Sequence, residues 1–146
     1  MHARILIVNG PNLNTLGSRQ PEIYGHETLA DIEAKCHEKA KNLGISVDCV
    51  QSNHEGEIVD AIQKAGKDFA GLIINGGAYT HTSIAIMDAL LSIKIPVIEV
   101  HLSNPLRRDE FRHVSYIGKA ATGSICGFGS NSYTLALDAI ADLVKP

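Results

Sequence analysis

Apolar and polar positions fall in alternating blocks along the chain, and these blocks predict strands and helices in turn. Residues 4–8 form a continuous apolar run after Arg4, which is typical of a strand covered on both faces. Residues 28–43 carry an apolar stripe at helical spacing, and Gly44 ends that pattern. The same pattern predicts further strands at residues 45–51, 71–74, 96–100 and 124–126, and further helices at residues 57–65, 83–93 and 133–144.

Five strands that alternate with helices predict an α/β fold with a doubly wound five-stranded parallel sheet. In such a fold a ligand is expected in a crevice outside the carboxyl ends of the strands. The chain has 146 residues, which is the length of one ordinary domain, so we expect a single domain over residues 1–146.

Composition narrows the class of protein. Apolar residues make up 45% of the chain and charged residues 20%, as in an ordinary globular protein. The three cysteines are odd in number and widely spaced, which argues against a disulfide framework and a thiolate zinc site. The apolar start is too short to span a membrane, and the net charge of −3 disfavours nucleic acid as a partner. We therefore expect a cytoplasmic protein without membrane contact.

Polar loops follow three of the predicted strands. Residues 9–25 form an unusually long connection, which is often a functional one. Residues 75–81 follow the third strand and residues 101–104 follow the fourth. Because parallel strands end at the same edge of a sheet, these loops are expected to meet where the fold places a ligand. Residues 127–130 are glycine-rich, and a tight turn followed by a Ser or Asn helix cap is favoured there over a phosphate site.

Glu99 and His101 are two residues apart on a strand, so their side chains share a face. With His81 they have the ligand types of a two-His-one-carboxylate metal site. An acid–base pair is favoured over the metal site, because no ligand spacing supports a metal and Glu99 is suited to orient the His101 ring. Among the basic residues, Arg112 is the better candidate for an anion clamp. For Arg107 and Arg108 a solvated helix face is as good an interpretation as anion binding.

Several ordered motifs resemble those of the type II 3-dehydroquinate dehydratases. They are Asn9-Gly-Pro-Asn-Leu-Asn, Leu16-Gly-x-Arg19, Pro21-x-x-Tyr24-Gly, Ser52-Asn-x-Glu-Gly56, Gly77-Ala-Tyr-Thr-His-Thr-Ser83, Glu99-Val-His-x-Ser-Asn104, Phe111-Arg-His113 and Gly127-Phe-Gly129. The resemblance covers Arg4 to about Leu143. Gln20, Gly76 and Ser132 depart from the family pattern, and none of them matches a catalytic position.

The resemblance implies a flavodoxin-like three-layer fold and a single catalytic domain that removes water from 3-dehydroquinate by anti elimination. It implies an enolate intermediate and no metal or organic cofactor. It assigns Tyr24 as proton acceptor, His101 as proton donor and Arg19 as transition-state stabiliser, with Asn12 and Glu99 assisting. The matching substrate-binding positions are Asn75, His81, Asp88, Leu102, Ser103 and Arg112.

The proposed base has to be reconciled with elementary chemistry. A neutral phenol is a poor base, with a reference pKa near 10. A guanidinium about 4 Å away attracts the phenolate by about 4 kcal/mol at an effective dielectric of about 20. Desolvation opposes this effect, so the net change is smaller. Arg19 lies five residues before Tyr24 on the same loop, and we therefore expect a lowered pKa for Tyr24.

Asp88 lies seven residues after His81, about 10 Å along a helix, so a small substrate can hardly touch both within one chain. The resemblance implies that the aspartate comes from an adjacent subunit, within trimers that assemble into a dodecamer. It leaves open a biosynthetic role in the shikimate pathway or a catabolic role on quinate.

Two competing functions make different demands on the sequence. A flavodoxin-like ligand-binding or signalling module predicts a Ser/Thr-rich loop after the first strand or an acidic phosphorylatable pocket, and the sequence has neither. A lysine Schiff-base dehydratase needs a lysine in the site. None of the three converging loops contains one.

Overall fold

In a computed structural model of the chain, five parallel strands form one sheet in the order β2-β1-β3-β4-β5. The structure describes residues 2–18 and 20–146, with the side chain of Tyr24 outside that description. The strands are β1 (Arg4–Asn9), β2 (Ser46–Gln51), β3 (Gly71–Asn75), β4 (Val97–His101) and β5 (Gly123–Cys126). The predicted doubly wound sheet is confirmed, and its strand order is that of the flavodoxin-like fold.

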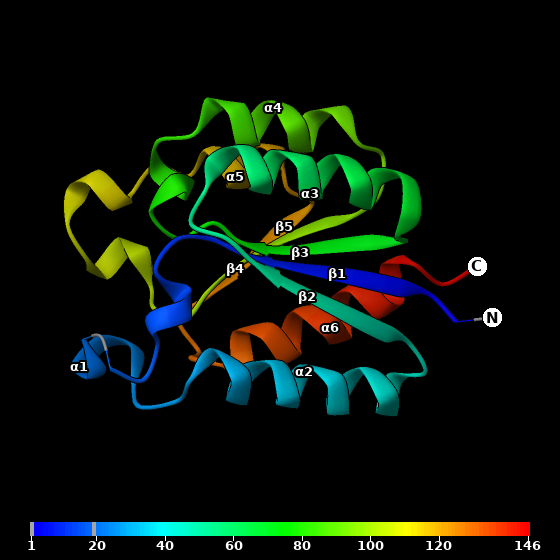
Figure 1. Cartoon of the computed structure of the whole chain (residues 1–146), viewed down its shortest axis with the longest axis horizontal. Coiled ribbons are helices and arrows are strands. Elements are labelled where there is room, and N and C mark those ends of the chain that lie inside the picture. Colours follow the sequence, from blue (N-terminus) through cyan, green and yellow to red (C-terminus); the bar gives the residue numbers. More distant parts are fainter. Residues whose placement is uncertain (1, 19) are drawn as a thin grey trace.

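Helices cover both faces of the sheet and make three layers (Figure 1). One face carries α2 (Leu29–Leu43) and α6 (Asn131–Leu143), and the other carries α3 (Glu55–Asp68), α4 (Ile84–Ser92) and α5 (Tyr116–Ala120). Each side has its own apolar core, because successive strand residues point to opposite faces. Ile5, Ile7 and Ile73 face α2 and α6, whereas Leu72 and Ile74 face α3 and α4.

Local signals explain where the helices begin and end. Thr28 accepts a hydrogen bond from the Asp31 backbone N–H at 3.2 Å while the Asp31 carboxylate accepts from the Thr28 N–H at 3.0 Å, which is a capping box. Gly44 ends α2 with φ at 74°, a left-handed conformation that glycine adopts without strain. The predicted turn before α6 is present, but the predicted side-chain cap is wrong. Ser130 occupies the cap position, yet its hydroxyl accepts a hydrogen bond from Lys35 instead.

The predicted elements agree with the observed ones to within a few residues. The second helix begins two residues earlier than its predicted core, and β4 starts after Pro96 rather than at it. The long connection after β1 holds two short elements, a 3-10 turn η1 (Leu13–Thr15) and α1 (Pro21–Tyr24). The segment after β4 contains the 3-10 turns η3 (Pro105–Arg107) and η4 (Glu110–Arg112) before α5.

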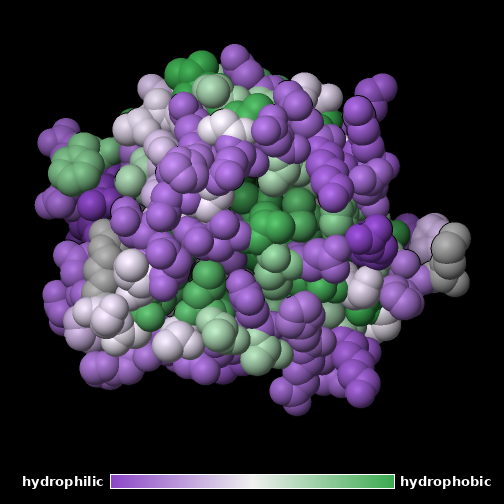
Figure 2. All heavy atoms as spheres, in the orientation of Figure 1, coloured by the Kyte–Doolittle hydropathy of each residue, from purple (hydrophilic) through white to green (hydrophobic). Residues whose placement is uncertain are grey.

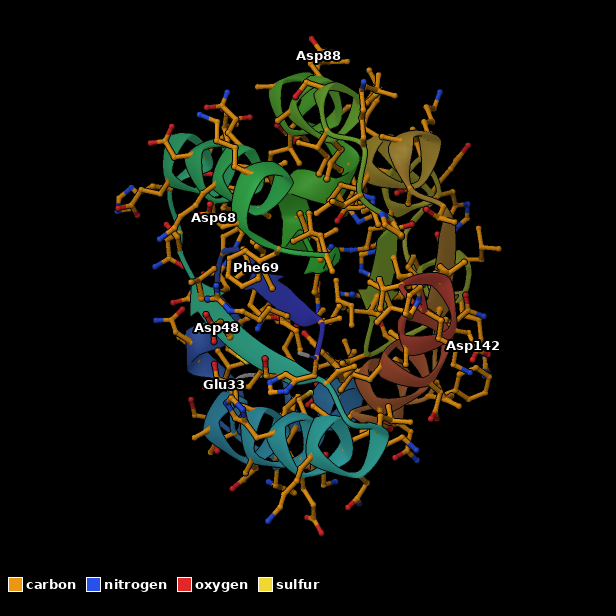
Figure 3. All side chains as sticks on the ribbon, turned by 90° about the vertical axis from the view of Figure 1, so that its right-hand side faces the viewer. Glu33, Asp48, Asp68, Phe69, Asp88 and Asp142 are labelled. Carbon is orange, nitrogen blue, oxygen red and sulfur yellow. The ribbon has the colours of Figure 1, made fainter. Side chains whose placement is uncertain are left out.

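The two ends of the sheet differ in character. Both chain termini lie at one end, on the right of Figure 1, where Arg4 pairs with Asp48 at 2.9 Å and packs its guanidinium over the Phe69 ring (Figure 3). The long connections gather at the opposite end, beyond the carboxyl ends of the strands. Apolar surface shows on the face nearest the viewer in Figure 2, by the β2 edge, where Val50 is exposed. Among the described residues, no helix is both long enough and apolar enough to cross a membrane.

Candidate active site

A pocket opens at the carboxyl ends of β1, β3 and β4. Between β1 and β3 the strand order reverses, which is where this fold class binds ligands. The pocket is partly open to solvent, and the space inside it is about 580 Å³ when it is counted out to the open mouth. Its lining is Pro11, Asn12, Leu13, Asn75, Gly77, Ala78, His81, His101, Leu102, Ser103, Pro105, Arg108 and Arg112. The predicted meeting of the three loops is therefore confirmed.

A buried His–Glu pair lies at the end of β4. His101 Nε2 is 2.8 Å from Glu99 Oε2, and Glu99 is only 3% exposed. Ser124, the register partner of Glu99 on β5, donates to Glu99 Oε1 at 2.6 Å, and the hydroxyl of Ser115 donates to Oε2. Gly118 of α5 lies so close that a Cβ there would stand 2.9 Å from Oε1. The carboxylate is thus held from β4, β5 and α5 together.

The protonation state of this pair follows from its partners. Burial by itself would raise the pKa of Glu99, but hydrogen bonds from His101, Ser115 and Ser124 outweigh it and hold that pKa below its ordinary value. An ionised carboxylate only accepts hydrogen bonds, so His101 Nε2 must carry the proton that it shares with Glu99. The other ring nitrogen, Nδ1, makes no hydrogen bond within the described part of the chain, and the ring lines the pocket. Nδ1 is therefore the nitrogen free to exchange a proton with a ligand.

His81 lies on η2 (Gly77–His81), directly after β3. Its Nδ1 is 2.8 Å from the backbone oxygen of Val114, so Nδ1 donates and Nε2 is left to the pocket. Burial lowers the pKa of His81, and the nearby His101 and Arg112 lower it further. The His81 and His101 rings stack with their centroids 6.4 Å apart. A neutral His81 presents a hydrogen-bond acceptor to a ligand hydroxyl.

The end of β1 and the turn after β4 supply the polar wall. Asn12 lines the pocket with a left-handed backbone (φ 70°), and its N–H donates to Asn53 Oδ1 at 3.0 Å. Leu102 is buried, and its carbonyl accepts from the Gly129 N–H at 3.0 Å, which fixes the chain where it leaves β4. Ser103 follows with its hydroxyl 3.4 Å from an Arg108 nitrogen.

Among the described residues two arginines reach the pocket, and the sequence singled out only one of them. Arg112 lines it with its guanidinium 5.0 Å from the centre of the Phe111 ring, and its buried Nε has no hydrogen-bond partner among the described residues. Arg108 also lines the pocket. The sequence alone did not distinguish this position for Arg108 from a place on a solvated helix face. Arg107, the other member of the cluster, is exposed and lies outside the pocket lining.

Two of the expected site residues cannot be placed, and a third faces away from the pocket. Arg19 and the side chain of Tyr24 lie outside the described residues, and the backbone places Tyr24 at the end of α1. Asp88 is exposed on α4 and points outward from the molecule, away from the pocket of its own chain (Figure 3).

The metal alternative finds no support in the geometry. Glu99 uses both carboxylate oxygens for hydrogen bonds with His101, Ser115 and Ser124, and His81 is turned to a backbone carbonyl. Across residues 2–18 and 20–146, no three His, Cys, Asp or Glu side chains are placed to hold a metal ion together.

Comparison with known proteins agrees with this geometry. Residues 3–141 match the family described as Dehydroquinase class II. The chain belongs to this family. It is 56% identical to the 3-dehydroquinate dehydratase of Dinoroseobacter shibae over 97% of this chain and 99% of that protein, and 56% identical to that of Rhizobium meliloti over 99% and 98%. The crystal structure of the type II dehydroquinase from Propionibacterium acnes superposes with a TM-score of 0.94 at 42% identity, over 97% of this chain and 98% of the other. Family membership disfavours the flavodoxin-like signalling module.

Proposed function

We propose that this chain is a 3-dehydroquinate dehydratase that removes water from 3-dehydroquinate to give 3-dehydroshikimate. The observation that carries the proposal is the buried His101–Glu99 pair at the floor of the pocket, in a chain of the class II dehydroquinase family. A hydroxyl departing from carbon needs a proton, and a ring with one nitrogen anchored to a carboxylate and the other open to the pocket is suited to supply it.

In the proposed mechanism the phenolate of Tyr24 removes a proton from the carbon next to the ketone. The electron pair of the broken C–H bond moves into an enolate, and Arg19 and Asn12 stabilise the developing charge. The enolate then collapses back to the ketone, the C–O bond to the leaving hydroxyl breaks on the opposite face, and His101, which for this step carries a proton on Nδ1 as well as on Nε2, donates its Nδ1 proton to make water. Glu99 orients the imidazole throughout.

Substrate binding is assigned to Asn75, His81, Leu102, Ser103 and Arg112, and Arg108 joins them because it lines the same pocket. A guanidinium suits the carboxylate of 3-dehydroquinate, and neutral His81 suits a ring hydroxyl. No step in this scheme needs a cofactor, because acid, base and charge stabilisation all come from side chains.

The test is the appearance of enone absorbance when 3-dehydroquinate is added. Wild type should give the signal, and Tyr24→Phe should lower kcat by about 10²–10⁴-fold, the usual contribution of a general base. Tyr116→Phe is the matched control, because Tyr116 lies on α5 outside the pocket. Absence of the signal from wild type, or an undiminished rate from Tyr24→Phe, would contradict the proposal.

We further propose that the active form is a homo-oligomer, a dodecamer built from trimers, in which Asp88 completes the site of a neighbouring subunit. Its support is the outer face of α4. Ile84, Asp88 and Leu91 lie on one stripe there, and the two apolar side chains are 48% and 60% exposed. Exposed apolar side chains that share one helix face form a surface that a second subunit can cover.

Subunit mixing tests this arrangement. Asp88→Ala and Tyr24→Phe should each be inactive alone, and mixing them under conditions of subunit exchange should restore a fraction of sites that combine an intact Asp88 with an intact Tyr24. Light scattering should find twelve chains. A fully active monomer, or no recovery in a mixture shown to have exchanged, would contradict the shared site. We place the protein in the cytoplasm and its reaction in the shikimate pathway or quinate breakdown.

A further inference from the structure

Three polar side chains are buried together beneath the pocket. Asn9 ends β1, Asn75 ends the neighbouring β3, and the two are register partners. Tyr133 comes from the first turn of α6, in the helical layer below the sheet, and its hydroxyl reaches both strand ends. All three residues are at most 3% exposed, so most of their hydrogen-bonding capacity has to be met within the protein. A polar cluster this deep must be satisfied internally or it destabilises the fold.

The hydrogen bonds of the cluster have a single consistent direction. The Gly77 backbone N–H donates to Asn75 Oδ1 at 3.1 Å, which turns Asn75 Nδ2 toward the Tyr133 oxygen at 3.0 Å. The Tyr133 hydroxyl donates in turn to Asn9 Oδ1 at 2.6 Å. Reversing the direction would set the Asn75 NH₂ group against the Gly77 N–H, donor against donor. The orientation of the Asn75 amide is therefore fixed by its surroundings.

This orientation determines what a ligand meets. Asn75 lines the pocket, and its Nδ2 has two hydrogens, of which Tyr133 takes one. The remaining N–H is the donor that Asn75 has left for a substrate oxygen. Without the Tyr133 hydroxyl the Gly77 N–H still holds Asn75 Oδ1, but the amide nitrogen loses its anchor, and the N–H that faces the pocket is less sharply directed.

The cluster also carries a cost that packing alone does not explain. Asn9 Nδ2 is buried without a hydrogen-bond partner among the described residues. Burial raises the pKa of Tyr133 far above that of an ordinary phenol, so the group stays a neutral hydroxyl that donates to one neighbour and accepts from the other. Three apolar side chains of the same shape would leave no amide unpaired. That the protein has polar side chains here instead indicates that they position a group in the pocket.

We propose that Tyr133 is a positioning residue, whose hydroxyl holds the Asn75 amide with an N–H directed at the bound substrate. The inference rests on the proposed function, in which Asn75 contacts 3-dehydroquinate. It predicts that an interaction buried in the α6 layer sets substrate affinity, although Tyr133 is absent from the pocket lining.

The test is Tyr133→Phe, which removes one oxygen and keeps the ring that fills the core. We expect KM for 3-dehydroquinate to rise about five- to tenfold with kcat within about twofold, because a neutral hydrogen bond to substrate is lost or misdirected in ground and transition states alike. Asn75→Ala should raise KM at least as much. Adding Tyr133→Phe to Asn75→Ala should then change KM no further, because the hydroxyl acts only through that amide.

Ile140→Val is the matched control. It removes one methyl group from a fully buried residue of the same helix, outside the pocket, and should lower thermal stability without changing KM. An unchanged KM in Tyr133→Phe would overturn the inference, as would effects of Tyr133→Phe and Asn75→Ala that simply multiply in the double variant. An equal rise of KM in Ile140→Val would assign the effect to loosened packing. Failure of wild type to convert 3-dehydroquinate is a separate result, which rejects the proposed function itself.

Discussion

Ser124→Ala is the most direct probe of how the buried carboxylate is kept charged. The Ser124 hydroxyl donates to Glu99 Oε1 at 2.6 Å, alongside the bonds from His101 and Ser115. Burial is the largest single influence on Glu99 and raises its pKa, whereas the three hydrogen bonds and the charge interaction with His101 lower it, so that the net pKa lies below its ordinary value. Removing one of the hydrogen bonds should therefore raise the pKa of Glu99.

The size of the effect follows from the bond that is lost. A hydrogen bond to a charged group contributes about 1.5–3 kcal/mol, and because the Ser124 bond is only part-buried we take about 1–2 kcal/mol. At about 1.4 kcal/mol for each pH unit, the titration of Glu99 should move up by about one pH unit. Glu99 is a carboxyl group whose pKa is lowered by folding, so it stabilises the fold in its ionised form. Its stabilisation is present above the unfolded pKa and lost as pH falls through the folded one, so in the variant the stabilisation should be smaller and its loss should be complete at a higher pH.

The assay is kcat by enone absorbance between about pH 4 and pH 9, with the melting temperature measured over the same range. In Ser124→Ala the acid limb of kcat should move to higher pH, and the stability deficit should be largest near neutral pH and shrink as pH falls and Glu99 becomes protonated in both proteins. Ser46→Ala is the control, since Ser46 begins β2 at the other end of the sheet. If the acid limbs of Ser124→Ala and wild type coincide while the variant is equally destabilised at every pH, Ser124 serves packing alone and the reasoning is wrong.

Two further predictions use the backbone around the pocket. Asn12→Gly should keep stability, because glycine tolerates the φ of 70°, yet lower kcat about tenfold or more through loss of the side chain. Asn12→Ala should lose about 1 kcal/mol of stability as well, so melting and kcat measured on both variants separate the two roles. Gly10→Ala should destabilise by about 3 kcal/mol in chemical denaturation, because its Cβ would stand 2.5 Å from the backbone oxygen of Gly76. If Gly10→Ala is as stable as wild type, the ends of β1 and β3 can separate enough to accommodate the added methyl group.

Most of the fold followed from sequence because its strands are buried on both faces. Residues 71–74, for example, contain no polar residue and are all buried, so the run is recognisable in the sequence as an interior strand. The five-residue helix α5 was missed, since a single turn shows no periodicity. The pocket was predictable from polar residues that directly follow strands, and Glu99 and His101 were paired by their spacing of two.

The residues that support the pocket were harder to find. Arg107, Arg108 and Arg112 look alike in sequence, and only the short turns η3 and η4 decide that Arg108 turns inward while Arg107 does not. Ser124 and Tyr133 act over long sequence separations, 25 residues from Glu99 and 58 from Asn75. Nothing local marks such a hydroxyl. The available signal was an Asn at the end of a buried strand, because a buried amide needs a hydrogen-bond partner.

The two supporting networks lie on opposite faces of the sheet, and this has a consequence for catalysis. By strand alternation Asn9 and Asn75 point to the α2–α6 face, where Tyr133 meets them, whereas Glu99 and His101 point to the other face, where Ser115 caps α5. Each helical layer thus supports a pocket residue through one hydroxyl, that of Tyr133 on the α6 side and that of Ser115 on the α5 side. Because the sheet separates the networks, changes on the α6 side should act on substrate affinity and changes on the α5 side on proton donation, and a variant from each side should combine with nearly additive free energies.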